Sequence, residues 1–395
     1  MHILVINYEY PPIGGGGGIV TRDILEHLVK LGHKVSIITT HFEGLEKYEI
    51  TAGVEIFRVP VLFRNKRQVS SMISLVSYPP SCVLNAFRLL NGRRYDVINT
   101  VFAVPSGPAG HILSRVLSLP NVLTIHGGDI FDPSRSFAPH KTPLVATTVQ
   151  ALLNRADRVV ASSSDTIANV HRYYKVKRPI DIIPLGITPP TFEKKTRHDF
   201  DLDFDETVFC TIGRLIKRKN IDDALQILAE IKHICQFKFI IIGDGPERAR
   251  IEKLVKHFGL ERRVLLLGCV SDEVKFQILE LSDCYLSTAL HEGFGLVFLE
   301  AMACGVPVIC YDRGGQNDFL INERTGFLIR LGDKKSFRDR IIRLIRDSEL
   351  RKKMSIFNKK LVTSYYVSKC AENYVSLFGE AISEFCRKRK YKEAL

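Results

Sequence analysis

Two carboxylates with a glycine-rich segment between them are the residues of this 395-residue chain best placed to do chemistry. Glu292 and Glu300 are eight positions apart. The apolar run at 284–289 predicts a buried strand, and residues 296–304, followed by a glycine, predict a helix. Glu292 would then lie on the strand-to-helix loop and Glu300 on the helix.

The turn between the two carboxylates offers backbone donors. We expect the amides of Phe294, Gly295 and Leu296 to fall in the first helical turn, where intrahelical partners are missing, so that they could bind an anion or sugar hydroxyls. The alternative is a solvent-exposed loop whose acidic residue favours the helix dipole. This stretch by itself leaves both interpretations open.

A second cluster favours the binding site. Residues 213–220 follow the apolar run at 208–212 and contain Arg214 and Lys219. The two cations would leave the end of one strand together, an arrangement that suits a diphosphate.

These two clusters together resemble the nucleotide-sugar site of the retaining family 4 glycosyltransferases, which have the GT-B fold. The resemblance rests on the E-x7-E pair Glu292 and Glu300, on the Gly-Phe-Gly-Leu between them, and on Gly213-Arg214-Leu215 with Lys219. It spans nearly the whole chain. It implies an α/β protein of two doubly wound Rossmann-like domains facing across a cleft, with Glu300 on the ribose and Glu292 on the donor sugar.

Short β-branched runs alternate with helix-length segments in both halves of the chain, which predicts two parallel sheets covered on both faces. A Pro- and Gly-containing linker near 182–190 divides them. Together with the family resemblance, this implies an N-terminal acceptor-side domain at 1–187, a nucleotide-sugar domain at 188–369, and a final helix at about 370–395 that returns to the first domain.

The loop after the first predicted strand contains five consecutive glycines, 14–18. Because it lies between a strand and a helix, its bare backbone could bind a phosphate or sugar; a flexible tether is the alternative. In the resembling family this loop faces the donor phosphates, and Gly15, Gly16 and Gly17 are the positions proposed here.

Other strand ends supply further candidates. His126 ends a strand and is followed by two glycines and Asp129. The resemblance places His126 at the donor sugar and makes Asp129 a candidate for acceptor contact. It also places Val270 near the nucleotide base, and Gly314 and Gly315 near the distal phosphate or sugar. Asn317 and Asp318 replace the Pro-Glu common in the family at this last loop.

Residues 58–94 mix basic and apolar side chains and contain no acid. That composition is typical of a surface resting on anionic lipid, and an ordinary pair of amphipathic helices on the sheet is the alternative. Tyr78-Pro79-Pro80 predicts a break that excludes one continuous helix.

Bulk composition narrows the function classes. The net charge of +13 is spread evenly, with +7 in residues 1–185 and +6 in the remainder, which argues against a nucleic-acid-binding face. Nine scattered cysteines predict buried reduced thiols, and no signal peptide or membrane span is indicated. We expect a cytoplasmic protein with possible peripheral contact with an anionic membrane on its cytoplasmic face.

The predicted activity is transfer of a hexosyl group from a nucleoside diphosphate sugar to a glycan or lipid-linked acceptor, with retention and without metal or cofactor. His126, Glu292, Arg214 and Lys219 are the predicted catalytic residues. Alternatives are a GT-B nucleotide-sugar epimerase, a phosphorylase, and a catalytically silent partner that binds nucleotide-sugar.

Overall fold

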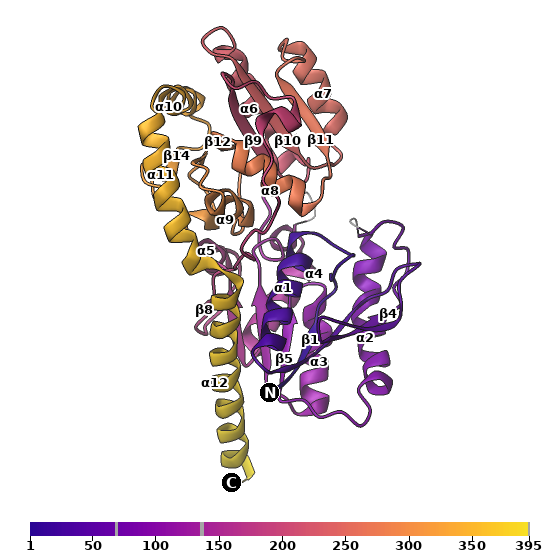
Figure 1. The fold of residues 1–395 in the computed structure, drawn as a ribbon. Coiled ribbons are helices and arrows are strands. Elements are labelled where there is room, and N and C mark those ends of the chain that lie inside the picture. Colours follow the sequence, from indigo (N-terminus) through magenta and orange to yellow (C-terminus); the bar gives the residue numbers. More distant parts are fainter. Residues whose placement is uncertain (68–69, 135–137, 394–395) are drawn as a thin grey trace. The chain divides into compact units, whose positions relative to one another are not determined.

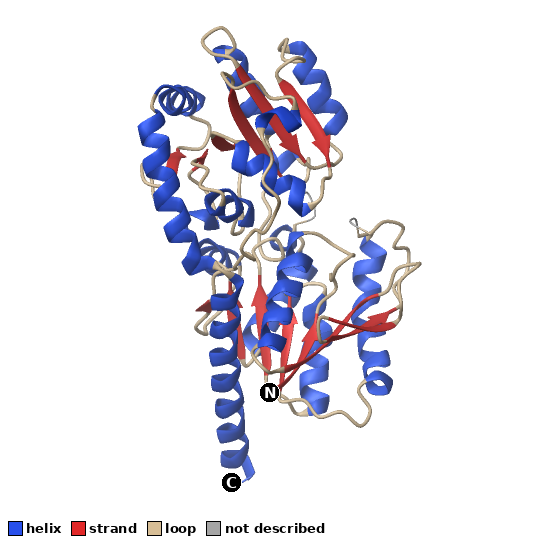
Figure 2. Cartoon of the chain, in the orientation of Figure 1, coloured by secondary structure: helices blue, strands red, loops and turns tan. Residues whose placement is uncertain are grey.

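The computed structural model describes residues 1–67, 70–134 and 138–393, and the chain divides into two compact units. Unit 1 comprises Met1–Thr188 and Tyr366–Leu395, and unit 2 comprises Pro189–Tyr365. The sequence-based division places these boundaries at 187/188 and 369/370. Each unit is an α/β structure in which helices surround a central sheet (Figures 1 and 2).

The sheet of unit 1 has the strand order β3-β4-β2-β1-β5-β6-β7-β8, and every neighbouring pair is parallel except β3 and β4. Its central strands are buried at successive positions, as expected when helices cover both faces. The strand β3 was not predicted, because it is short, largely exposed and lacks an apolar run. The strands are β1 (His2–Ile6), β2 (Lys34–Thr40), β3 (Tyr48–Thr51), β4 (Val54–Val59), β5 (Val97–Val101), β6 (Asn121–Ile125), β7 (Arg158–Ala161) and β8 (Asp181–Ile182).

The last helix belongs to unit 1. Figure 1 shows α12 in yellow beside this unit, where it packs against α1 and reaches β5 and β6. Arg158 on β7 fastens it by pairing with Glu380 at 3.2 Å and Glu384 at 2.8 Å. The helices are α1 (Gly16–Lys30), α2 (Met72–Leu89), α3 (Ser106–Leu117), α4 (Pro143–Arg155), α5 (Ser164–Tyr173) and α12 (Val367–Glu393), with a 3-10 turn η1 (Pro139–Lys141).

The predicted break at Tyr78-Pro79-Pro80 is wrong, because α2 continues through both prolines. Tertiary contacts outweigh the helix penalty of proline. Tyr78 is fully buried, donates a 2.8 Å hydrogen bond to the Ile38 carbonyl, and meets the Tyr8 ring edge-on. Pro80 lies on the exposed side, where water can solvate the carbonyls that lose their amide partners.

Unit 2 is built on a fully parallel sheet of order β11-β10-β9-β12-β13-β14. The chain order reverses between β9 and β12, and this creates a switch point where ligands of doubly wound sheets bind. All six strands lie within a few residues of their predicted positions. They are β9 (Thr207–Ile212), β10 (Phe237–Ile242), β11 (Val264–Gly268), β12 (Cys284–Ser287), β13 (Val308–Tyr311) and β14 (Gly326–Ile329).

Helices and short 3-10 turns connect these strands. The α9 helix follows β12 directly, as predicted, and the turn η3 follows β9. The helices are α6 (Ile221–Ile231), α7 (Arg248–His257), α8 (Asp272–Leu281), α9 (Leu296–Ala303), α10 (Lys334–Arg346) and α11 (Ser348–Leu361), and the 3-10 turns are η2 (Arg197–Phe200), η3 (Lys217–Lys219), η4 (Gly315–Asp318) and η5 (Val362–Tyr365).

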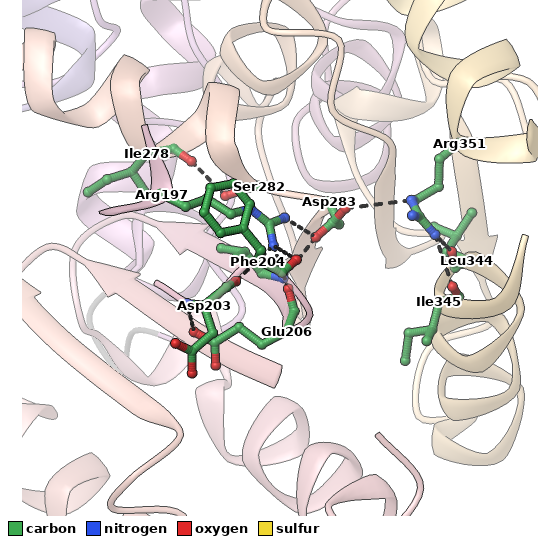
Figure 3. Close-up of polar contacts among 11 residues, drawn as sticks. Arg197, Asp203, Phe204, Glu206, Ile278, Ser282, Asp283, Leu344, Ile345 and Arg351 are labelled. Carbon is green, nitrogen blue, oxygen red and sulfur yellow. Dashed lines mark hydrogen bonds and ion pairs between the residues drawn. The ribbon is translucent and has the colours of Figure 1, made fainter. Parts of the chain in front are cut away.

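The segment before β9 is held to the amino-terminal end of the sheet by one carboxylate. Figure 3 shows Asp283 between Arg197 and Arg351, with Asp283 Oδ2 accepting from Arg197 at 2.9 Å and from the Val208 amide at 2.9 Å. Arg351 on α11 lies 3.6 Å from the other oxygen of Asp283. Arg197 also donates to the carbonyls of residues 203, 204 and 206. The network joins the linker, two strand ends and α11, and it stands opposite the switch-point end.

All nine cysteines are free thiols, as predicted; five are buried, whereas Cys235 and Cys304 are half-buried and Cys269 and Cys386 are exposed. Within the part of the chain that the structure describes, no helix has the length and apolarity needed to cross a bilayer.

Replacing Asp283 by alanine should destabilise unit 2, because two arginines and one strand amide lose a shared acceptor. We expect the free energy of unfolding to fall by about 3 kcal/mol. Urea denaturation measures the change. Asp339→Ala, which removes an exposed carboxylate paired with Arg338, is the matched control and should leave the midpoint nearly unchanged. Equal midpoints for both variants would refute the anchoring role of Asp283.

Candidate active site

The candidate site of unit 2 lies at the carboxyl ends of three adjacent strands, β9, β12 and β13. The loop after β9 carries the predicted cations, and the loop after β12 carries Glu292. The two loops therefore meet at the switch point between β9 and β12, where parallel strands diverge and leave room for a ligand.

A buried tyrosine stabilises this divergence. β9 and β12 pair only at Cys284↔Phe209 and Tyr285↔Cys210. Beyond that point the Tyr285 hydroxyl accepts from the Ile212 amide at 3.0 Å and donates to the Ile212 carbonyl at 3.1 Å. The Tyr285 hydroxyl thus satisfies the backbone N–H and C=O of the last residue of β9 and fixes where the loop after β9 begins.

Further bonds join the two loops. The Leu290 amide donates to the Arg218 carbonyl at 2.8 Å, and the Thr288 hydroxyl donates to the Asn220 carbonyl at 2.7 Å. The Arg218 guanidinium also donates to the His291 carbonyl. The cationic turn and the carboxylate loop consequently form one connected structure.

Glu292 is the electrostatic centre of this structure. The residue is 7% exposed, and its carboxylate accepts hydrogen bonds from Lys219 Nζ at 2.6 Å and from the Arg218 guanidinium at 2.9 Å. Burial opposes its charge, but the two cations outweigh burial and lower the pKa of Glu292 to about 2. The prediction named Lys219 and omitted Arg218, whose position beside Lys219 in the same basic run was the available signal.

Two glycines make this packing possible. A Cβ on Gly213 would lie 2.7 Å from Lys219 Cε, so only glycine lets the lysine pass the end of β9. A Cβ on Gly314 would lie 2.2 Å from the Glu292 carbonyl oxygen, and the φ of Gly314 is +129°. Both backbones approach the pair more closely than any other residue type would permit.

The Gly315 amide, predicted to lie near the distal phosphate or sugar, has a partner within the protein. The Gly315 N–H donates to the Glu292 carbonyl at 2.8 Å, and Glu292 and Gly314 form a parallel β-bridge. The loop after β13 thus braces the Glu292 backbone. The neighbouring Gln316 is 2% exposed and donates to the carbonyls of Tyr311 and Arg313, which fixes the turn.

The helix after Glu292 begins at Leu296, as predicted, but not all three expected amides lie in its first turn. Gly295, with φ of +96°, is the N-cap of α9, so the Leu296 amide lies in the first turn and the Phe294 amide precedes the cap. Phe294 is 3% exposed and its ring packs against Phe319 at 5.1 Å. Its side chain anchors the loop in the core, and the helix start after Gly295 keeps the favourable end of its dipole.

Glu300 lies on α9, as predicted, and has a cationic partner that was not predicted. Lys275 on α8 donates to Glu300 at 2.7 Å and to Asp272 at 2.9 Å. Burial opposes the charge of Lys275, but the two carboxylates prevail and raise its pKa. Lys275 therefore stays charged and holds Glu300 in place.

Arg214 and Val270 complete the predicted set in unit 2. Arg214 directly follows Gly213 after β9 and is exposed, and no side chain within the described ranges pairs with it. Val270 is half-buried between β11 and α8, two strands from β9 at the same end of the sheet. Arg214 is thus the cation of this cluster that is open to a ligand.

In unit 1 the glycine run forms the start of a helix. α1 begins at Gly16, with Gly15 as its N-cap. Gly15 and Gly16 are exposed, and a Cβ on either would meet nothing within 4 Å. The first amides of α1 lie at the carboxyl end of β1, where the strand order of this sheet reverses between β1 and β5.

Phe102 links the glycine run to His126. A Cβ on Gly17 would lie 2.5 Å from the Phe102 ring, and that ring meets the His126 imidazole edge-on at 5.1 Å between centroids. Phe102 has a φ of +72°, which is rare for a bulky residue and marks strain held by its surroundings. Phe102 was not among the predicted site residues, since backbone strain leaves no signal in the residue letters.

His126 ends β6 as predicted, and its charge state is set by burial. Burial lowers the pKa of His126 to about 4, so the imidazole is neutral near pH 7. Its Nδ1 has no hydrogen-bond partner among the residues that the structure describes. That nitrogen is buried, whereas the His126 side chain as a whole is half-buried, and a neutral imidazole has one donor and one acceptor nitrogen for hydrogen bonds.

Asp129, predicted to contact an acceptor, holds backbone instead. Its two oxygens accept from the Ala103 amide at 2.7 Å and from the His126 amide at 3.0 Å. Burial raises the pKa of Asp129 to about 6 in spite of these bonds. Its carboxylate joins the ends of β5 and β6 and positions His126.

Comparison with protein families decides the identity. The model "Glycosyltransferase Family 4" matches residues 14–189, and "Glycosyl transferases group 1" matches residues 192–361. This chain belongs to the family 4 glycosyltransferases. It is therefore a transferase enzyme, and both the predicted family and the predicted enzyme class are confirmed.

Individual relatives cover the chain almost completely. N-acetyl-alpha-D-glucosaminyl L-malate synthase of Bacillus anthracis is 27% identical over 95% of this chain and 96% of its own length. UDP-Gal:alpha-D-GlcNAc-diphosphoundecaprenol alpha-1,3-galactosyltransferase of Escherichia coli is 26% identical over 96% and 97%.

Solved structures show the same fold. Sucrose-phosphate synthase from Thermosynechococcus elongatus superposes with a TM-score of 0.86 at 23% identity, covering 97% of this chain and 100% of that one. Anabaena HepE in complex with UDP-glucose gives 0.76 at 20% identity, covering 97% and 100%. The predicted GT-B fold is confirmed.

Glu292→Gln should lower the free energy of unfolding of this glycosyltransferase by an amount that depends on pH. Because the folded pKa of Glu292 lies below its ordinary value of 4.5, its ion pairs stabilise the fold above about pH 4.5 and lose that effect as the pH falls toward 2. We expect a deficit of about 3 kcal/mol in unfolding free energy at pH 7 that narrows by pH 3. Denaturant titrations at both pH values measure it.

The exposed Glu252→Gln is the control for this variant and should show no such trend. A deficit equally large at pH 3 and pH 7 would show that Glu292 acts through packing rather than through charge.

The Gly17–Phe102 contact predicts opposite effects for two neighbouring substitutions. Gly17→Ala should cost about 2 kcal/mol of stability, because its methyl group displaces the Phe102 ring. Gly16→Ala finds open space at a helix start and should be neutral or stabilising. Thermal unfolding distinguishes them, and an equal loss in both would exclude the ring contact as the cause.

Proposed function

We propose that this glycosyltransferase moves a hexosyl group from a nucleoside diphosphate sugar to a glycan or lipid-linked acceptor, with retention at the anomeric carbon and without a metal ion. The observation that carries the proposal is the Arg218–Lys219–Glu292 cluster at the switch point of unit 2, with Arg214 exposed beside it. Charged side chains held by ion pairs and one exposed cation, Arg214, thus lie together at the place where such sheets bind nucleotides.

The cluster suits a leaving diphosphate. Bond breaking at the anomeric carbon leaves negative charge on the β-phosphate, and preorganised cations stabilise that charge most effectively. Arg214 is free to bind it, and Lys219 donates one of its three N–H groups to Glu292 in a hydrogen bond and keeps donor capacity for a ligand. The start of α9 adds its dipole to the same end of the sheet.

The setting of Glu292 argues against a glycosidase-like nucleophile. Each of its oxygens is engaged by a cation, and its pKa of about 2 makes it a weak base. A carboxylate so held can still accept hydrogen bonds from sugar hydroxyls. We assign it to orientation of the donor sugar, and Glu300, held by Lys275, to the ribose hydroxyls.

The remaining assignments concern residues of unit 1. The neutral His126 can bind a hydroxyl of the transferred sugar, and the amides at the start of α1 (Gly15, Gly16 and Gly17) are assigned to phosphate oxygens, with the Gly15 N–H exchanging its 3.3 Å bond to Glu9 for the ligand. Retention is proposed from the likeness of the motif to the retaining family. Absence of a cofactor and a cytoplasmic location are part of the same proposal.

The acceptor class is proposed from the relatives. The Escherichia coli relative is named for a diphosphoundecaprenol-linked sugar and the Bacillus anthracis relative for L-malate. The apolar and basic surface of α2 favours an acceptor at a lipid surface for this chain. A nucleotide-sugar epimerase, or a silent partner that binds the donor alone, is the competing assignment.

The test is donor turnover by the purified protein with UDP-, GDP- and ADP-sugars, in EDTA. Slow nucleoside diphosphate release should occur from one donor and fall roughly a hundredfold in Arg214→Ala, because one cation is lost from the developing charge. Lys217→Ala, which removes an exposed cation two residues from Lys219, is the control and should stay within about twofold of wild type.

Other outcomes separate the competitors. Binding of a donor by calorimetry without any release would favour the silent partner, and release of an epimerised sugar without acceptor would favour the epimerase. Neither binding nor release from any donor would refute the proposed transferase activity, and a rate abolished by EDTA would refute metal independence.

A further inference from the structure

The α2 helix of unit 1 presents apolar side chains to solvent. Met72, Ile73, Val76, Leu84 and Phe87 are between 51% and 74% exposed. The opposite side of the same helix supplies the buried residues Ser74, Tyr78, Cys82 and Ala86. The core contact of α2 is therefore already satisfied by its other face.

The spacing of these residues defines one continuous stripe. At 100° per residue, positions 72, 73, 76, 80, 83, 84 and 87 fall within one third of the helix circumference, and all seven are apolar. The stripe runs through the proline pair without a charged residue. A water-facing helix of a globular protein normally places its polar residues there, so this surface is fitted to another medium or partner.

The apolar surface extends beyond α2 on both sides. Leu62 and Phe63, in the loop before the helix, are 60% and 66% exposed. Between α2 and α3 lies an open groove of about 230 Å³, lined mainly by Ala86, Phe87, Leu90, Leu113 and Leu117. Exposed Ile112 and Val116 on α3 lie beyond it. A groove of this kind can receive an apolar chain.

Exposed cations lie in the segments on either side of this apolar stripe in the sequence and at the end of α2. Between Glu55 and Asp96 the sequence has no acidic residue. Arg58 and Arg93 are used internally by Glu49 and Glu55. Four further cations are exposed: Lys66, Arg67, Arg88 and Arg94.

We propose that the face formed by α2 and its preceding loop docks on an anionic lipid bilayer. Charge complementarity selects this occupant, because an apolar stripe between cations matches acyl chains beneath anionic headgroups. An ordinary protein interface would be expected to include acidic residues among the cations. The consequence that the acceptor is presented at the bilayer rests on the proposed function, but lipid binding itself does not.

Vesicle cosedimentation of the full chain tests the proposal. Wild type should bind equimolar phosphatidylglycerol–phosphatidylcholine vesicles at low salt, bind phosphatidylcholine alone weakly, and lose binding at high salt. Val76→Glu/Leu84→Glu should reduce the affinity more than tenfold, because both charges would enter the acyl region. Both side chains are above 70% exposed, so the fold should tolerate the change.

Matched controls separate this face from general surface effects. Ile356→Glu alters a side chain of α11 that is equally exposed, at 72%, and should bind as wild type. Arg88→Ala/Arg94→Ala should lower affinity about fivefold per arginine, whereas Lys353→Ala/Lys360→Ala on α11 should not.

The proposal would be overturned if the wild-type protein did not bind anionic vesicles, or if Val76→Glu/Leu84→Glu and Ile356→Glu bound them equally well. It would also be overturned by a wild-type dimer in sedimentation velocity that Val76→Glu/Leu84→Glu dissociates. That last result would assign the face to a second copy of the chain. Donor turnover without lipid, measured on the same preparations, keeps the two proposals separate. Normal turnover with no vesicle binding refutes only the lipid surface, and vesicle binding without turnover refutes only the transferase.

Discussion

The buried charge of Glu292 is the constraint on which the unit 2 site depends. An isolated carboxylate at 7% exposure would be unstable in ionised form, so the fold must deliver cations to both of its oxygens. That requirement fixes the loop after β9 against the loop after β12. It also demands glycine at 213 and 314, because any side chain there would occupy the space of the ion pair or its backbone.

The candidate site of unit 1 also depends on a buried carboxylate, that of Asp129, but this carboxylate is held by backbone amides rather than by cations. Asp129 is buried between two backbone amides, and its pKa of about 6 records how little compensation they provide. The buried carboxylate has a structural effect, because it holds the ends of β5 and β6 together and orients His126. The strained Phe102 then fills the space that Gly17 leaves. Both units thus hold short loops with buried polar groups rather than with extra secondary structure.

Charge is used differently at the site and on the surface of this glycosyltransferase. At the switch point most cations are neutralised by carboxylates, and Arg214 is left open to a ligand. Around α2 the exposed cations Lys66, Arg67, Arg88 and Arg94 lie near apolar side chains in a segment that contains no acidic residue. The net charge of +13 therefore conceals two arrangements, one suited to a small phosphorylated ligand and one suited to an extended anionic surface.

The sequence by itself determined every strand except β3, the two-unit architecture, the helix after Glu292 and the importance of Lys219, because apolar runs, glycines and charges carry local signals. Tertiary structure decided the rest. Lys219 and Glu292 pair across 73 positions, and the same pairing consumes Arg218 and the Gly315 amide. The continuation of α2 through Pro79 and Pro80 depends on the burial of Tyr78. Each of these outcomes is set by partners distant in the chain, whose contributions local propensity does not contain.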